Sequence, residues 1–237
     1  MKIVLINFSG NIGKSTLARH LFAPRLGVEA ISMETHNADD GGVRVTSNDF
    51  DFVQEHLLDN ESAVVDVGSS NIAGLLQQMT EYDASHEDFD LFIVPVVPVM
   101  KQQKDTIATI DALHSIGVPA KKIRLLFNDV RKDMDIEAIF GVLFSYAEEE
   151  KKFLIRSNAI VYHAEVFEKI KAMNDADGKP LTVHALANDT TDYAELRRNT
   201  PVEDKATRAE YMALHLEKRR AISVNENLDQ VFKAITK

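Results

Sequence analysis

The sequence contains no cysteine among its 237 residues. Without cysteine the chain has no disulfide framework and no cysteine-based metal or redox chemistry. None of the eight histidines stands in a zinc-ligand spacing such as His-Glu-x-x-His. The composition therefore excludes thiol chemistry, gives no support for a zinc site, and fits the reducing conditions of a cytoplasm.

Tryptophan is also absent, and aromatic residues make up 7% of the chain. So few aromatic rings argue against a base-stacking platform for single-stranded nucleic acid. The formal net charge of −10 argues against broad electrostatic adhesion to nucleic acid. Residues 193–237 are slightly basic, however, and include the compact run Lys218-Arg219-Arg220. This run is interpreted as a solvated helix end, with a contact to DNA or a partner as the alternative.

Long apolar runs are missing as well. The longest, residues 91–100, contains two prolines and is too short to span a bilayer. The apolar stretch at the N-terminus is too short for a signal peptide and is followed at once by a loop. We therefore expect a cytoplasmic protein without a membrane segment.

At its N-terminus the chain has a strand, a glycine-containing loop and a helix in succession. Residues 2–7 are apolar and β-branched, as in a buried strand, and residues 17–22 have the apolar spacing of one helix face. Between them, Gly10 and Gly13 let backbone N–H groups approach an anion, and the new helix offers its positive N-terminus to the same anion. The succession predicts a loop that binds the phosphates of a nucleotide.

Two side chains that follow the second glycine suit this chemistry. Lys14 would reach the β- and γ-phosphates, and the Ser15 hydroxyl would bind Mg²⁺. The strict pattern G-x-x-x-x-G-K-[ST] is not met, because Phe8 occupies its first glycine position. A chance Gly-Lys-Ser at the start of a helix is the alternative, and the flanking strand and helix favour the phosphate-binding loop.

The segment Asn7–Thr16, NFSGNIGKST, resembles the deviant Walker A loop of the ParA/MinD family, which typically reads N-x-K-G-G-x-G-K-[ST]-T. The resemblance implies ATP and Mg²⁺ as cofactors. Ser9 departs from the family at its signature lysine, which reaches across a dimer to the partner's ATP, and Asn11 replaces the second glycine. Nucleotide binding is still expected, whereas the rate of hydrolysis is left open. The expected nucleotide contacts in the loop are Ser9, Gly10, Asn11, Ile12, Gly13, Lys14, Ser15 and Thr16.

Two strand ends extend the resemblance. Glu34, after the strand expected over residues 28–33, matches the first acidic position of the family's Walker A′ motif, and His36 falls on the second, which positions the attacking water. Asp66, in the strand that begins at residue 63, resembles the Walker B aspartate and would hold Mg²⁺ together with Ser15. The expected catalytic residues are Lys14, Glu34, His36 and Asp66. The alternatives are a solvated acidic loop at residues 34–40 and a simple turn at Asp66.

Asn128 is a further candidate for nucleotide contact. It follows the strand expected over residues 122–127, where the family has an asparagine that hydrogen-bonds the edge of adenine. An ordinary Asn-Asp turn is the alternative.

Strands and helices alternate along the whole chain, which predicts an α/β fold: a doubly wound, mostly parallel sheet with helices on both faces. We expect one P-loop ATPase domain over residues 1–237, with the site at the carboxyl ends of the strands. A single amphipathic helix is expected over residues 133–152. Two closing helices, 205–221 and 224–236, are expected to meet near Ser223.

The resemblance implies an ATP-dependent molecular switch for plasmid DNA segregation or stability, with a link to conjugative transfer as a close variant. It further implies a nucleotide-dependent homodimer, a small DNA- or centromere-binding adaptor protein, and a direct or indirect contact with DNA. Two other functions stay open. One is a small-molecule kinase or ATP-dependent synthetase, for which Lys101 and Lys104 are the available basic residues. The other is a nucleotide-binding scaffold that does not hydrolyse ATP, suggested by Ser9 and His36.

Overall fold

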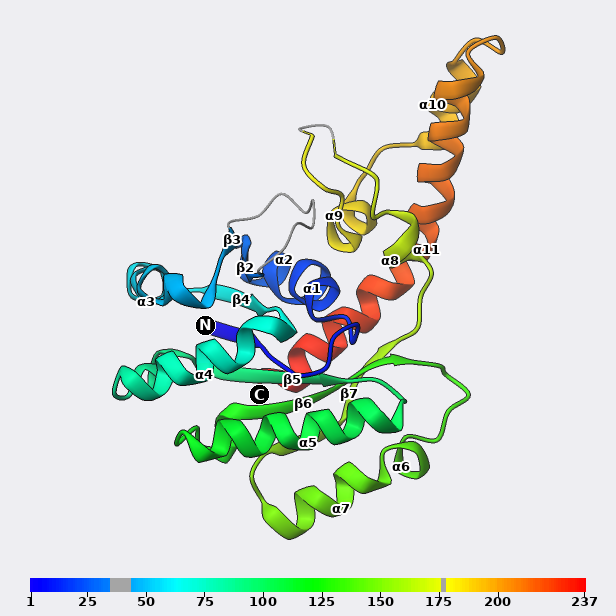
Figure 1. The fold of residues 1–237 in the computed structure, drawn as a ribbon. Coiled ribbons are helices and arrows are strands. Elements are labelled where there is room, and N and C mark those ends of the chain that lie inside the picture. The colour runs from blue at the N-terminus through cyan, green and yellow to red at the C-terminus, as the bar shows by residue number, and fades with distance from the viewer. Residues whose placement is uncertain (35–43, 176–177) are drawn as a thin grey trace. The chain divides into compact units, whose positions relative to one another are not determined.

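The computed structural model describes residues 1–34, 44–175 and 178–237 (Figure 1). The described chain divides into two compact units. Unit 1 comprises Met1–His163 together with Gln230–Lys237, and unit 2 comprises Ala164–Asp229. This division does not test the expectation of a single domain over residues 1–237, which remains a prediction.

Unit 1 is built on a seven-stranded sheet with the strand order β3-β2-β4-β1-β5-β6-β7. All of its pairings are parallel, which confirms the predicted α/β class. The central strands are short apolar runs, as expected for strands that are buried on both faces. The strands are β1 (Lys2–Leu5), β2 (Ala30–Met33), β3 (Arg44–Val45), β4 (Ala63–Val67), β5 (Leu91–Val96), β6 (Ile123–Val130) and β7 (Leu154–Tyr162).

Helices cover both faces of this sheet, as Figure 1 shows. On one side the chain leaves β1 through α1 (Lys14–Leu17), a π-helical turn (Ala18–Phe22) and α2 (Ala23–Leu26). On the other side lie α4 (Ile72–Glu81), α5 (Met100–Ser115) and α7 (Gly141–Glu150). Because β1 has β4 and β5 as neighbours, the loop after β1 opens at the centre of the sheet.

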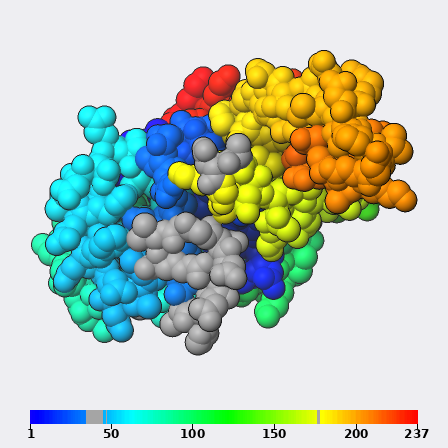
Figure 2. Space-filling view, turned by 90° about the horizontal axis from the view of Figure 1, so that it is seen from above, coloured from blue at the N-terminus to red at the C-terminus, as the bar shows by residue number. Residues whose placement is uncertain are grey.

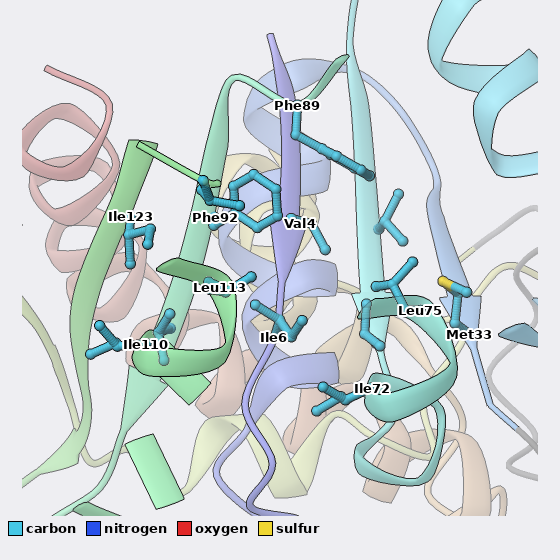
Figure 3. Packing of buried hydrophobic residues seen from close by; sticks show 14 of the residues in the cluster. Val4, Ile6, Met33, Ile72, Leu75, Phe89, Phe92, Ile110, Leu113 and Ile123 are labelled. Carbon is cyan, nitrogen blue, oxygen red and sulfur yellow. The ribbon is translucent and has the colours of Figure 1, made fainter. Parts of the chain in front are cut away.

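The core of unit 1 follows the two-residue alternation of the strands. Val4 and Ile6 of the β1 segment point toward α4 and α5, where they join Phe92, Leu75 and Leu113 in one buried cluster (Figure 3). Leu5 lies between them and Ile3 precedes them; both belong to the opposite face of the sheet, and both are fully buried. At the end of the π-helical turn, the ring of Phe22 contacts the ring of Phe232, with 6.2 Å between the ring centroids.

Helix α3 (Phe50–Asp59) lies at the left-hand margin of unit 1 in the space-filling view (Figure 2). A capping box formed by Thr46 and Asp49 opens the 3₁₀ turn that leads into it. Its buried face carries Phe50 and Val53 among others, whereas Leu58 is exposed. The helix is therefore anchored along one stripe, as expected for an amphipathic surface helix.

The helix expected over residues 133–152 is in fact two helices, so that prediction was wrong. Helix α6 (Ile136–Ile139) begins after Asp135, whose carboxylate accepts hydrogen bonds from two backbone N–H groups, and α7 begins at Gly141. Between them Phe140 is fully buried, with its ring 4.7 Å from that of Phe127 in β6. Packing of this ring against the sheet sets the break.

Unit 2 is helical. Its elements are α8 (Val166–Lys169), α9 (Val183–Asn188), α10 (Tyr193–Asn199) and most of α11 (Lys205–Ile235), which continues into unit 1 after Asp229. The two closing helices predicted at the C-terminus are one helix of 31 residues. The segment contains no glycine or proline, and the Ser223 hydroxyl donates to Arg220 O within the helix, so nothing breaks the helix there.

The basic run Lys218–Arg220 accordingly lies inside α11 and not at a helix end, which corrects that interpretation. Lys218 Nζ donates to Thr191 O at 2.8 Å, and Arg220 pairs with Glu217. Two of the three basic side chains are therefore engaged within unit 2. Among the described helices, none combines the length and the apolarity that crossing a bilayer requires.

Candidate functional site: a phosphate-binding loop

The loop between β1 and α1 has the backbone conformation of an anion cradle. Asn11 and Gly13 adopt positive φ angles of 51° and 82°. Asparagine is one of the few residues that tolerate this left-handed region, which explains how Asn11 can replace the family's second glycine. In the described part of the chain, no backbone N–H group from Gly10 to Thr16 donates to a protein acceptor. These donors are the groups that would meet phosphate oxygens.

Gly13 is required for a second reason besides its φ angle. A Cβ atom at this position would lie 2.4 Å from Asn128 Nδ2. The Asn128 amide donates to Ile12 O at 2.8 Å and is 8% exposed. The structure thus brings Asn128 onto the loop, while its expected contact with adenine stays a prediction.

Lys14 lies inside the loop. Its Nζ donates to Ser9 O at 2.9 Å and to Asn7 O at 3.1 Å, and the residue is 7% exposed. Burial lowers the pKa of the Lys14 ammonium from its usual value, and the carboxylates of Asp66 and Glu34 partly offset this effect. The ammonium and two of the predicted acidic residues therefore share one electrostatic site.

Asp66 reaches this site from the neighbouring strand. In the parallel pairing of β1 with β4 it stands opposite Leu5, the last residue of β1, and it is 3% exposed. Ser15, one residue into α1, is exposed. A carboxylate and a hydroxyl are hard oxygen ligands of the kind that Mg²⁺ takes in addition to phosphate oxygens and water. Ser15 and Asp66 therefore fit the Mg²⁺ ion that a nucleotide-binding loop implies. The described residues contain no group of three or more His, Cys, Asp or Glu side chains that could hold a metal ion without a nucleotide.

Glu34 lies beside the turn that follows β4. Gly68 N donates to Met33 O at 2.9 Å, and a Cβ on Gly68 would meet Met33 O at 2.9 Å and Glu34 Cγ at 3.0 Å. Only glycine permits so close an approach of the two strand ends. The same turn reaches the loop, because Ser69 Oγ lies 3.6 Å from the position of a Cβ on Gly10. His36, the remaining predicted catalytic residue, lies outside the described residues.

Comparisons with known proteins agree with this geometry at the level of the fold. No family model and no curated protein matches the sequence. MinD in the MinC:MinD cell division protein complex of Aquifex aeolicus matches the structure with a TM-score of 0.50 and 11% identity, over 96% of this chain and 95% of that one. The chain has the MinD fold.

Two other solved structures match less well. MinD of Aquifex aeolicus alone gives a TM-score of 0.46 with 12% identity, over 96% of both chains. The Cyanothece McdA(D38A)–ATP complex gives 0.44 with 10% identity, over 94% of this chain and 96% of that one. The match to MinD in the MinC:MinD complex confirms the predicted α/β fold class.

The sequence analysis missed several residues that shape the site within this MinD fold. Asn71 is 2% exposed and donates to Met33 O at 3.1 Å, so it helps to hold the end of β2 against the turn after β4. Thr106 and Thr109 of α5 are fully buried and bond to the start of the loop. The available signal was weak, because it consisted of two threonines three residues apart, a spacing that places them on one face of a helix.

Proposed function

We propose that the protein is an ATP-dependent molecular switch of the ParA/MinD type that acts in plasmid DNA segregation or stability, with conjugative transfer as a close variant. One observation supports nucleotide binding. The Lys14 ammonium lies inside a loop whose N–H groups have no acceptor among the described residues, and the Asp66 carboxylate of the adjacent strand acts on its charge. The MinD fold supports this reading. The DNA role rests on the resemblance of the loop sequence.

Each residue then has a defined task. The N–H groups of Gly10–Thr16 bind the phosphates, and Lys14 exchanges its two carbonyl partners for phosphate oxygens. Ser15 and Asp66 hold Mg²⁺, which neutralises the charge that develops on the phosphates. Glu34, which lies beside the Gly68–Ser70 turn, and the turn itself, which reaches Gly10 through Ser69, are proposed to respond to the terminal phosphate. His36 is proposed to orient the attacking water.

The switch would act through association. We propose that nucleotide binding brings two copies together face to face and that hydrolysis releases them. MinD has been solved in complex with MinC, and by analogy a partner protein is proposed here, namely a small DNA- or centromere-binding adaptor. Contact with DNA, direct or through this adaptor, belongs to the same proposal.

The deciding experiment compares the wild type with Lys14→Ala. Calorimetric titration with a non-hydrolysable ATP analogue and Mg²⁺ should show binding by the wild type and none by the variant. Light scattering should show a mass increase only in the wild type with nucleotide. The exposed Lys121→Ala is the matched control, because it removes the same charge at a distance from the loop. Equal affinity in the wild type and Lys14→Ala would refute the proposal.

A scaffold that binds nucleotide without turnover is favoured by one observation. Ser9 is 7% exposed and has a short side chain, so nothing at this position extends across an interface to a second nucleotide. Turnover measured with and without DNA and the adaptor separates the two functions. Ser9→Lys should leave nucleotide affinity unchanged and raise turnover, if the missing lysine is what limits hydrolysis. No rise in turnover would argue for the scaffold.

A further inference from the structure

The start of the phosphate-binding loop is held by a side chain outside the glycine–lysine motif. Asn7 is fully buried, and its Nδ2 donates to Pro95 O of β5 and to Thr106 Oγ1 of α5, both at 2.8 Å. Its Oδ1 accepts from Ser9 N at 2.8 Å. The Asn7 side chain therefore ties the first turn of the loop to the neighbouring strand and helix.

Helix α5 contributes two hydroxyl groups to this contact. Thr109 Oγ1 accepts from Phe8 N at 2.9 Å and donates to Asp105 O at 2.8 Å within the helix. Thr106 Oγ1 accepts from Asn7 Nδ2 and donates to Gln102 O at 2.8 Å. Both threonines are fully buried, so water cannot replace either contact.

These bonds divide the loop into two parts. The N–H groups of Phe8 and Ser9 donate to Thr109 and to Asn7, whereas those of Gly10–Thr16 have no protein acceptor in the described residues. The carbonyls of Asn7 and Ser9, which receive the Lys14 ammonium, lie in the held part. Fixing the first part of the loop therefore fixes the position of the lysine that meets the phosphates.

We propose that Asn7, Thr106 and Thr109 are positioning residues that fasten the phosphate-binding loop to α5, so that the loop and α5 move as one body and a displacement of α5 changes nucleotide affinity. This inference rests on the proposed function of the site. The first turn of α5 is exposed at Met100, so an event at that end of the helix would reach the loop through the two threonines.

The test uses the full chain with the paired substitution Thr106→Val and Thr109→Val, which keeps side-chain volume and removes both hydroxyls. Thr80→Ala is the matched control: Thr80 Oγ1 makes the same type of helical bond, to Leu76 O at 2.9 Å, on α4 away from the loop. The paired serine substitutions retain the hydroxyls and should behave as the wild type. Two measurements are made: hydrogen exchange of the Phe8 and Ser9 amides without nucleotide, and affinity for a non-hydrolysable ATP analogue with Mg²⁺.

The valine pair should accelerate exchange of the Phe8 and Ser9 amides, which donate to Thr109 and to Asn7. It should also weaken analogue binding by about tenfold, because the binding-competent loop is less populated. Thr80→Ala should change neither measurement. If the valine pair does not fold, Thr109→Val alone serves, since it removes the acceptor of Phe8 N–H and leaves the bond from Asn7 to Thr106 in place. Exchange and affinity equal to those of Thr80→Ala would overturn the inference. Failure of the wild type to bind the analogue would instead overturn the proposed function, while the exchange data still decide whether α5 fastens the loop.

Discussion

The sheet of unit 1 and helix α10 of unit 2 are stabilised by different interactions. The largest fully buried side chains, such as Phe22, Phe92 and Phe127, all belong to unit 1 and pack around its sheet. In unit 2, by contrast, α10 has no buried residue and Leu196 on it is 38% exposed. Helix α10 relies on polar contacts instead: Asp192 caps it, and Arg208 Nη1 donates to its end at Thr200 O.

This difference shows which part of the molecule can hold the charged groups of the phosphate-binding site in fixed positions. A site that must hold an ammonium group near two carboxylates needs rigid supports, which the buried sheet of unit 1 provides. Helices held by caps and surface hydrogen bonds open locally at lower cost. We therefore expect substitutions in the sheet of unit 1 to affect folding cooperatively and substitutions in α10 to have local effects.

The largest contrast should come from paired truncations of apolar side chains. Phe127→Ala in β6 removes a fully buried ring that contacts Phe140 and Phe144, and should lower the free energy of unfolding by about 3–5 kcal/mol. Leu196→Ala in α10 should change it by about 0.5 kcal/mol or less. Urea denaturation of both variants measures the difference. Similar losses of unfolding free energy in the two variants would show that α10 is packed as tightly as the sheet of unit 1.

A second contrast depends on pH. Burial, with a smaller effect of Arg19, lowers the pKa of His20 to about 3, and His20 is the only buried histidine in the described residues. The unfolded chain binds a proton at His20 below about pH 6.5 while the native state does not, so stability falls as pH drops from about 6.5 toward 3, by about 1.4 kcal/mol per pH unit.

Urea denaturation between pH 4 and 6.5 tests this effect. Replacing His20 with Gln should remove this part of the pH slope and leave the part due to carboxylates. The exposed His114→Gln is the control in the same unit. An unchanged slope in His20→Gln would show that the native state accepts the proton.

The smallest effect is expected at a helix cap of unit 2. The Asp192 carboxylate accepts from Glu195 N at 2.9 Å, which lowers the pKa of Asp192. Asp192→Ala should destabilise α10 by about 1 kcal/mol and speed hydrogen exchange in its first turn. Analogue binding in unit 1 should not change. Loss of nucleotide affinity in this variant would show that the two units are coupled more tightly than their separate contacts indicate.

Much of the site could be predicted because its signals are local. The apolar run of β1, the two glycines and Lys14 lie within 13 residues, and backbone stereochemistry alone makes that succession a strand, a loop and a helix. Asp66 and Glu34 were predicted as site residues because Asp66 lies near the end of an apolar strand and Glu34 directly follows one. The break at Phe140 was missed because it depends on a ring packing against β6, which helical periodicity does not encode.

By itself the sequence determined the alternation of strands and helices, the conformation of the loop and the residue types that face a phosphate, since these depend on neighbours within a few positions. Only the tertiary structure decided that β4 and β5 flank β1, that Asn128 packs over Gly13 across 115 residues of chain, and that two threonines of α5 bond to the start of the loop. Such contacts depend on how crossover connections stack distant segments. No spacing within a short window carries that information.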